Sequence, residues 1–216
     1  MMKKIQIGVM GSAADLNYSD EALEFAKKLG AKIAESGNIL VYGAEKGYSS
    51  LSTNAAIEAS KNGGLTVGIT GGKDKEVYGD FTPDVLIPCR LGIGGGREFT
   101  LVLSCDVIIA IGGGSGTLTE MAIAYQAGIP IITISKFDGW AKKISGTYLD
   151  DRNRLKCIEA TLPEEAVEKA INEVKKINDK WKMEDIWLYR CLFLIRGQSI
   201  CFIFSSYIWR NNNSVV

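Results

Sequence analysis

Short apolar segments alternate with helix-like segments along most of this chain, and this alternation restricts the fold more than any other feature. Most of the apolar segments are continuous, as expected for strands that are buried on both faces of a parallel sheet. The predicted strands are residues 5–9, 39–42, 65–69, 85–87, 107–111 and 129–134. Such strands joined by helices predict an α/β protein with a doubly wound parallel sheet and right-handed crossovers.

The predicted helices lie between these strands and usually end at a glycine, where a left-handed C-cap is needed. They are residues 20–36, 50–62, 98–105, 117–127 and 163–178. Because the alternation continues to about residue 180, we predict a single domain over residues 1–180, with helices flanking the sheet. Ligands of such sheets bind at the carboxyl ends of the strands, so the loops that follow the strands are the places to search.

The 216-residue chain contains no histidine, and its 25 basic residues balance its 25 acidic residues. The first fact excludes Ser-His-Asp and Cys-His nucleophilic sites and His-ligated metals, and we expect no metal and no cofactor. The second argues against nucleic acid as a partner, because phosphate-backbone affinity needs clustered Lys and Arg. Five cysteines without a CxxC pair, and an apolar start too short for a signal peptide, predict a cytoplasmic protein.

The last 36 residues, 181–216, form a hydrophobic tail that holds three of the four tryptophans. Its length would suit a membrane span, but Arg190, Arg196 and Gln198 lie in the middle of the apolar stretch, which disfavours insertion. Three interpretations stay open: an element packed on the domain or on a partner, a membrane anchor, and a non-native tail. The tail carries no weight in the functional argument.

Four glycines in five residues follow the predicted strand at 107–111 and lead into a helix that we expect to begin at Thr117. Glycines let backbone amides approach an anion, and the positive end of a helix favours a phosphate. The predicted phosphate-binding residues here are Gly112, Gly113, Gly114, Ser115, Gly116 and Thr117. The alternative is a plain turn in which Thr117 and Glu120 form a capping box. The segment matches neither GxGxxG nor the P-loop, which disfavours an NAD enzyme and an ATPase.

Three other loops after strands have the same small-residue character and add Gly11, Ser12, Gly43 and Gly96 to the predicted ligand-binding residues. Arg97 begins a predicted helix, where its charge opposes the helix dipole, so it is better placed to reach an external anion. The alternative is a solvated Arg97 or one paired with Glu98 or a nearby Asp. Parallel strands bring all four loops to one edge of the sheet, as in a nucleotide-phosphate site.

These residues resemble the signature of the LOG proteins, once described as lysine decarboxylases, in which an Arg-Lys pair is followed at a fixed distance by PGGxGTxxE. Arg97 stands 15 residues before Gly112, and GGGSGTLTE fills the second half of the pattern. Gly11 and Ser12 resemble the family's first glycine loop, and VYGAEKGYSS resembles its second. The resemblance covers residues 3 to about 178. It implies a Rossmann-like fold, a homodimer, and hydrolysis of a nucleoside 5′-monophosphate to a base and ribose 5-phosphate.

By this resemblance, Arg97 and Glu120 are the catalytic residues: Arg97 would anchor the nucleotide, and Glu120 would stabilise an oxocarbenium-like transition state and orient water. Several positions depart from the family pattern, with Glu98 in place of the Lys, Gly112 in place of the Pro, and Thr119 in place of an acidic residue. These departures resemble a related branch that includes uncharacterised LOG-like proteins and molybdenum-cofactor carrier proteins. The alternative function is therefore a non-enzymic carrier or sensor of a phosphorylated pterin or nucleotide.

Overall fold

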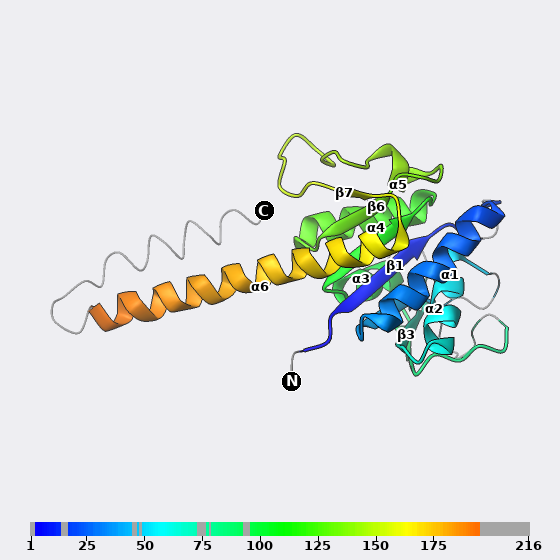
Figure 1. The fold of residues 1–216 in the computed structure, drawn as a ribbon, viewed down its shortest axis with the longest axis horizontal. Helices are drawn as coiled ribbons and strands as arrows, with labels where there is room; N and C mark the ends of the chain where they lie inside the picture. The colour runs from blue at the N-terminus through cyan, green and yellow to red at the C-terminus, as the bar shows by residue number, and fades with distance from the viewer. Residues whose placement is uncertain are drawn as a thin grey trace. The chain divides into compact units, whose positions relative to one another are not determined.

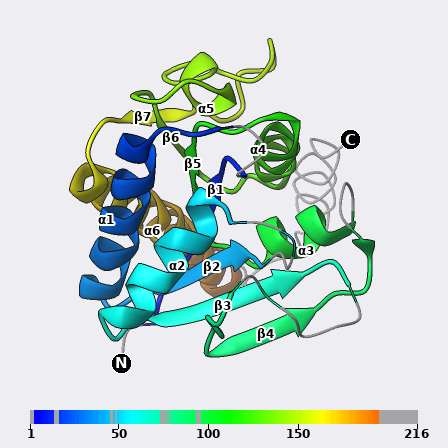
Figure 2. The same ribbon diagram turned by 90° about the vertical axis from the view of Figure 1, so that its right-hand side faces the viewer.

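A computed structural model of the chain describes residues 3–13, 17–44, 47, 49–72, 77, 79–92 and 96–194, with side chains up to residue 180. Within these residues, seven strands form one parallel sheet (Figure 1), and their order, which can be followed in Figure 2, is β4-β3-β2-β1-β5-β6-β7. The strands are β1 (Gln6–Gly11), β2 (Ile39–Gly43), β3 (Leu65–Thr70), β4 (Val85–Pro88), β5 (Val107–Ile111), β6 (Ile131–Ile134) and β7 (Ile158–Ala160). The predicted doubly wound α/β fold is confirmed.

The strand order reverses at β1, which pairs in parallel with β2 on one side and with β5 on the other. The chain builds outwards from β1 through β2 and β3 to β4, then returns to the centre and builds outwards again through β5, β6 and β7. This reversal creates a switch point at the carboxyl ends of β1 and β5, where the connections diverge to opposite faces.

Helices cover both faces of the sheet, and each face has its own apolar core (Figure 2). One core contains residues of α1 (Asp20–Glu35), α2 (Leu51–Lys61) and the first turns of α6 (Pro163–Leu194). The other contains residues of α3 (Arg97–Leu103), α4 (Ser115–Ala127) and α5 (Trp140–Lys143). The central strand β5 is buried along its whole length, which explains its continuous apolar sequence.

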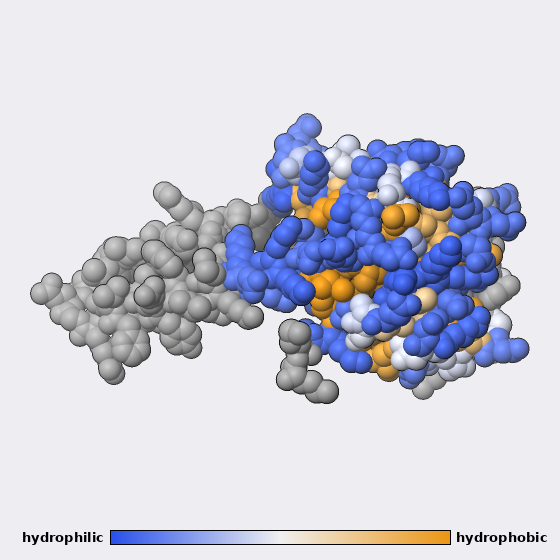
Figure 3. All heavy atoms as spheres, in the orientation of Figure 1, coloured by the Kyte–Doolittle hydropathy of each residue, from blue (hydrophilic) through white to orange (hydrophobic). Residues whose placement is uncertain are grey.

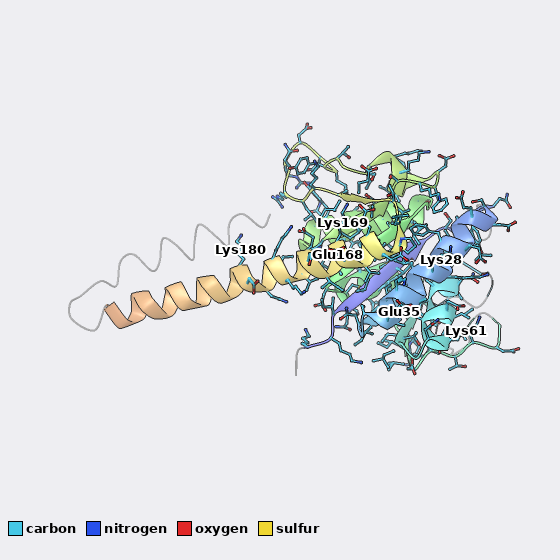
Figure 4. The ribbon with its side chains drawn as sticks, in the orientation of Figure 1. Lys28, Glu35, Lys61, Glu168, Lys169 and Lys180 are labelled. Carbon is cyan, nitrogen blue, oxygen red and sulfur yellow. The ribbon has the colours of Figure 1, made fainter. Side chains whose placement is uncertain are left out.

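Helix α1 shows how the local sequence sets these layers. Ser19 accepts a hydrogen bond from the Ala22 amide at 3.2 Å and so caps the helix. Leu29 and other apolar residues at helical spacing face the sheet, whereas Lys28 and Glu35, both labelled in Figure 4, lie on the exposed face of α1. On the face shown in Figure 3, hydrophilic residues form most of the coloured surface.

Two elements were not predicted. Strand β7 has three residues, too few for a periodic pattern to reveal, and it is defined by parallel pairing with β6. Helix α5 has four residues and follows Gly139. Strand β4 was predicted, but it forms the edge of the sheet, so its Val85 and Ile87 side chains are exposed rather than buried on both faces.

Backbone contacts divide the chain into two compact units, Met1–Val174 and Lys175–Val216, and the predicted domain boundary at residue 180 stays a prediction. Helix α6 continues to Leu194, beyond the predicted end at residue 178. No helix in the described part of the chain combines the length and the apolar character that a membrane span requires. The tail side chains, and the backbone after Leu194, lie outside the described residues, so the three interpretations of the tail stay open.

Candidate functional site

The glycine loop between β5 and α4 follows the central strand of the sheet. Gly112 and Gly113 adopt positive φ angles of 60° and 89°, a region that side chains with a Cβ rarely occupy. A Cβ at Gly113 would lie 2.4 Å from the Cβ of Thr117, so the loop is also closely packed. Helix α4 begins at Ser115, two residues before the predicted start, because the tight turn is complete at Gly114.

The start of α4 carries no side-chain cap within the described residues, since Gly114 occupies the N-cap position. The alternative of a capping box is therefore wrong: Thr117 lies inside the first turn, and Glu120 faces Arg97 instead. Ser115 and Gly116 are exposed at this end of the helix. Uncapped amides and the positive end of a 13-residue helix can receive an anion.

Neighbouring segments hold the glycine loop in place. Ser12, just after β1, accepts a hydrogen bond from the Gly113 amide at 2.8 Å through its Oγ. The amides of Trp140 and Ala141 donate to the carbonyls of Gly113 and Gly112 at 3.0 and 2.9 Å. The Gly113 amide is thus already engaged within the protein, and the Ser12 hydroxyl keeps its own proton to donate.

Arg97 lies in a buried charged cluster at the same edge of the sheet. Its Nη2 is 2.9 Å from Oε1 of Glu98 and 3.7 Å from Oε1 of Glu120. The three side chains are only 11%, 2% and 8% exposed, in the order Arg97, Glu98 and Glu120. The alternative in which Arg97 pairs with Glu98 is confirmed, so Glu98 neutralises the arginine rather than standing as an isolated charge.

Gly43 makes room for this arginine. A Cβ at Gly43, the last residue of β2, would lie 2.5 Å from Nη1 of Arg97. The absence of a side chain there lets the guanidinium lie against the β2 backbone. The structure therefore places Gly43 beside Arg97, and Ser12 beside Gly113, as the convergence of the loops at one edge predicts.

Two more of the predicted glycines pack against neighbouring backbone or side chains. A Cβ at Gly11 would lie 2.9 Å from the Cβ of Leu51, the first residue of α2. Gly96 occupies the N-cap position of α3, and a Cβ there would lie 2.2 Å from the Cβ of Leu91. Both glycines allow close approach of the chain segments that border the site.

A cavity of about 540 Å³ opens beside the glycine loop, on the α1 side. It is bounded by the ends of β1 and β5, the start of α1 and the loop after β6. Its lining residues are Ser12, Asn17, Tyr18, Ser19, Glu21, Ala22, Leu51, Gly112, Gly113, Gly114, Lys136, Phe137, Asp138 and Gly139. Arg97 and Glu120 are not among the residues that line this cavity.

Sequence reasoning missed the side of this cavity formed by residues 17–22 and 136–139. Lys136 Nζ lies 2.7 Å from Oε1 of Glu21, and a hydrogen bond from Lys142 lowers the pKa of Asp138 from its ordinary value. Gly139, with φ at 137°, packs against the backbone of Gly112 and Gly113. The Asp138-Gly139 pair is a turn signal that was available in the sequence. The contact between Gly139 and the glycine loop could not be predicted from the sequence.

The described part of the chain contains no group of three or more His, Cys, Asp or Glu side chains that could hold a metal ion. Amides and hydroxyls at the start of α4 can bind an anion, and a buried carboxylate and arginine lie at the same edge of the sheet.

A doubly wound parallel sheet with a glycine-rich turn at its switch point defines a Rossmann-like protein. The chain belongs to the SLOG cluster4 family, which matches residues 4–167. This match confirms the resemblance to LOG-like proteins. An uncharacterized protein from Archaeoglobus fulgidus is 36% identical over 127 residues, which are 59% of this chain and 78% of that protein.

Solved structures support the resemblance to the LOG-like branch that includes molybdenum-cofactor carrier proteins. The molybdenum cofactor binding protein from Rippkaea orientalis is 30% identical, with a TM-score of 0.67 over 81% of this chain and 99% of that one. The molybdenum cofactor carrier protein from Chlamydomonas reinhardtii is 27% identical, with a TM-score of 0.60 and the same coverage. The predicted similarity to molybdenum-cofactor carrier proteins is confirmed.

Proposed function

We propose that this chain is a binding protein for a small phosphorylated ligand of the pterin or nucleotide class. The observation that carries the proposal is the cavity of about 540 Å³ beside the glycine loop, together with the uncapped start of α4. Cavities of a few hundred cubic ångströms at the switch point of a parallel sheet are the usual place for such ligands.

In this proposal the phosphate lies at the start of α4. Because the Gly113 amide already donates to Ser12, the amides of Ser115, Gly116 and Thr117 take the phosphate oxygens, and the Ser12 hydroxyl donates a further hydrogen bond. This narrows the predicted set of phosphate-binding residues in this loop, which began at Gly112. The neutral net charge of the chain suits an anion held by local dipoles.

The ligand class comes from the relatives. The Rippkaea orientalis protein is described as binding the molybdenum cofactor, and this chain covers 99% of its length at 30% identity. A pterin that carries a phosphate has a flat aromatic ring, whose faces can stack on apolar side chains, at one end and an anion at the other. The cavity offers Leu51, Ala22 and Phe137 for the first, and it adjoins the glycine loop for the second.

We favour a carrier over a hydrolase because of Glu98. The LOG pattern has a lysine there, whereas this carboxylate is 2.9 Å from the Arg97 guanidinium and is almost fully buried with it. An arginine neutralised in this way has less charge to offer a nucleotide phosphate. Glu120, which also faces Arg97, is only 8% exposed, so water and substrate have little access to the carboxylate.

The phosphoribohydrolase remains the second candidate, because Arg97 and Glu120 do come together at the correct edge of the sheet, 3.7 Å apart. In that reaction Glu120 would orient the attacking water and stabilise the positive charge that develops on the ribose as the bond to the base breaks. Arg97 would hold the nucleotide.

Two measurements separate the candidates. Native mass spectrometry of the purified protein, with fluorescence of the released material, detects a co-purifying pterin or nucleotide. Incubation with AMP, GMP and CMP, followed by chromatography, detects free base and ribose 5-phosphate. Bound ligand without product supports the carrier, product supports the hydrolase, and neither ligand nor product contradicts both.

A matched pair of glycine variants tests whether the ligand binds at the start of α4. Gly113→Ala should abolish ligand binding, because its φ of 89° and its contact at 2.4 Å with Thr117 force the loop to move. Gly128→Ala, at the other end of α4, has a similar φ of 70° with nothing within 4 Å of the new Cβ. It should lose some stability but keep ligand affinity. Equal loss of binding in both variants would place the ligand elsewhere.

We also propose that the protein is a homodimer, as the family resemblance implies. Phe99 and Leu103, one turn apart on α3, are 53% and 58% exposed and would be suitable for an interface. Light scattering of wild type and of Phe99→Ser tests this: a dimer that becomes a monomer supports the interface. A wild-type monomer contradicts it. The cytoplasmic location stays a prediction.

A further inference from the structure

The Lys136–Glu21 ion pair lies on the rim of the cavity and is separate from the hydrogen bonds that hold the glycine loop. Glu21 comes from the first turn of α1, and Lys136 follows β6, so the pair joins two separate elements across the cavity. The side chains are 45% and 66% exposed for Lys136 and Glu21. Ion pairs with this exposure contribute little to stability, so opening the pair for a ligand costs little.

The pair presents a definite hydrogen-bonding pattern to the cavity. The Lys136 ammonium has three donors and no acceptor, whereas the Glu21 carboxylate has two oxygens that only accept. With 2.7 Å between the two groups, a ligand edge that replaces the contact needs an acceptor next to one or two donors. The ring of Phe137 beside them is buried and braced by Phe25 at 5.3 Å, so it forms a fixed wall.

This pattern fits the 2-amino-4-oxopyrimidine edge that pterins and guanine share. Its carbonyl oxygen accepts from an ammonium, and its ring N–H and exocyclic amino group donate to the two oxygens of one carboxylate. Adenine offers one ring acceptor and one amino donor, which leaves a carboxylate oxygen without its bond. Hypoxanthine keeps the carbonyl and the ring N–H but lacks the amino group.

We propose that Glu21 and Lys136 determine which heterocycle this protein binds, and that they select a 2-amino-4-oxo ring whose phosphate lies at the glycine loop. This inference rests on the proposed function and deepens it, because it assigns the heterocycle end of the same cavity. Glu21 accepts from the ring N–H and amino group, and Lys136 donates to the carbonyl oxygen.

Three nucleotides with the same ribose phosphate test the assignment: GMP, IMP and AMP. Calorimetric titration of the wild-type protein should show GMP bound about tenfold or more tightly than IMP, because a hydrogen bond to a charged group is lost with the amino group. IMP should in turn bind more tightly than AMP, since only IMP offers Lys136 its carbonyl oxygen.

Each variant should remove one of the two preferences. Glu21→Gln should bring GMP and IMP to within about threefold of each other, because the amide has one acceptor instead of two. Lys136→Met should remove the preference of IMP over AMP and leave the protein folded, since the pair is exposed. The control is Glu24→Gln, one turn along α1, whose carboxylate is 59% exposed and paired with Lys27 at 2.6 Å. This control variant should keep the wild-type order of affinities, with GMP bound most tightly, then IMP, then AMP.

The outcomes separate this inference from the proposed function. Nucleotide binding with no preference for GMP, or a preference that survives Glu21→Gln, overturns the role of the ion pair but leaves the phosphate site in place. No binding of any of the three, with no co-purifying pterin, overturns the proposed function and the inference with it. Loss of the preference in Glu24→Gln as well would show that the effect is a general one on α1.

Discussion

Replacement of Arg97 by Met should be one of the most destabilising single changes in this protein. The methionine is similar in length, so it fills much of the space but removes the cation. Two carboxylates would then remain in a site where Glu98 is 2% exposed and Glu120 is 8% exposed. Each of them loses the guanidinium that lies 2.9 or 3.7 Å away.

The expected loss in free energy of unfolding follows from the burial of this charged cluster. Removing one partner of a buried ion pair typically costs about 3–5 kcal/mol, because an uncompensated charge stays in the interior. An exposed pair typically contributes about 1 kcal/mol or less. Since a domain is usually stable by about 5–15 kcal/mol, we expect Arg97→Met to remove a large fraction of the free energy of unfolding.

Urea unfolding followed by circular dichroism measures this loss. The double variant Arg97→Met/Glu98→Gln should recover at least about 1 kcal/mol, because a neutral amide is less costly to bury than a carboxylate. The control is Arg152→Met. In the wild-type protein the Arg152 side chain is 48% exposed and pairs with Asp150, which is 32% exposed. A loss below about 1 kcal/mol in Arg97→Met, or no recovery in the double variant, would refute the argument.

Two further predictions concern stability. Gly30→Ala should destabilise the fold by about 2 kcal/mol despite better helix propensity. Its Cβ would lie 1.9 Å from the Ala55 carbonyl oxygen, which forces α1 and α2 apart; an unchanged melting temperature would contradict this. Hydrogen bonds from Lys169 and the Thr161 amide lower the pKa of Glu165 from 4.5 to about 2. Glu165 should therefore contribute stability above pH 4.5 that is lost as the pH falls to about 2. The deficit of Glu165→Gln in urea unfolding should shrink over this range, and a pH-independent deficit would contradict it.

The sequence predicted most of the fold because each signal was local. Continuous apolar runs identified β1 to β6, and the glycine after α4 has the left-handed φ of 70° that a C-cap needs. Strand β7 was not predicted because three residues are too few to show a period, and because it is defined by pairing with β6, as in Ile132 with Ile158, which are 26 positions apart. The extra length of α6 was not predicted because the helical periodicity weakens near residue 181, where the hydrophobic tail begins.

For the candidate site, the sequence identified the backbone but not the side-chain partners. Four glycines after a buried strand predicted the turn, and two of them have positive φ. Whether Arg97 was free or paired could not be decided, since Glu98 is adjacent in sequence but Glu120 reaches the cluster from another helix. The choice between carrier and hydrolase depends on this geometry.

By itself, the sequence determined the α/β class, the parallel sheet and the glycine-rich turn before α4, because periodicity and backbone sterics act between residues close together in the chain. Only the tertiary structure decided that β1 lies between β2 and β5, which brings Ser12 to Gly113 across 101 positions. It also decided that Lys136 meets Glu21 above the cavity. Contacts of this kind depend on the order in which strands join the sheet, and no local pattern records that order.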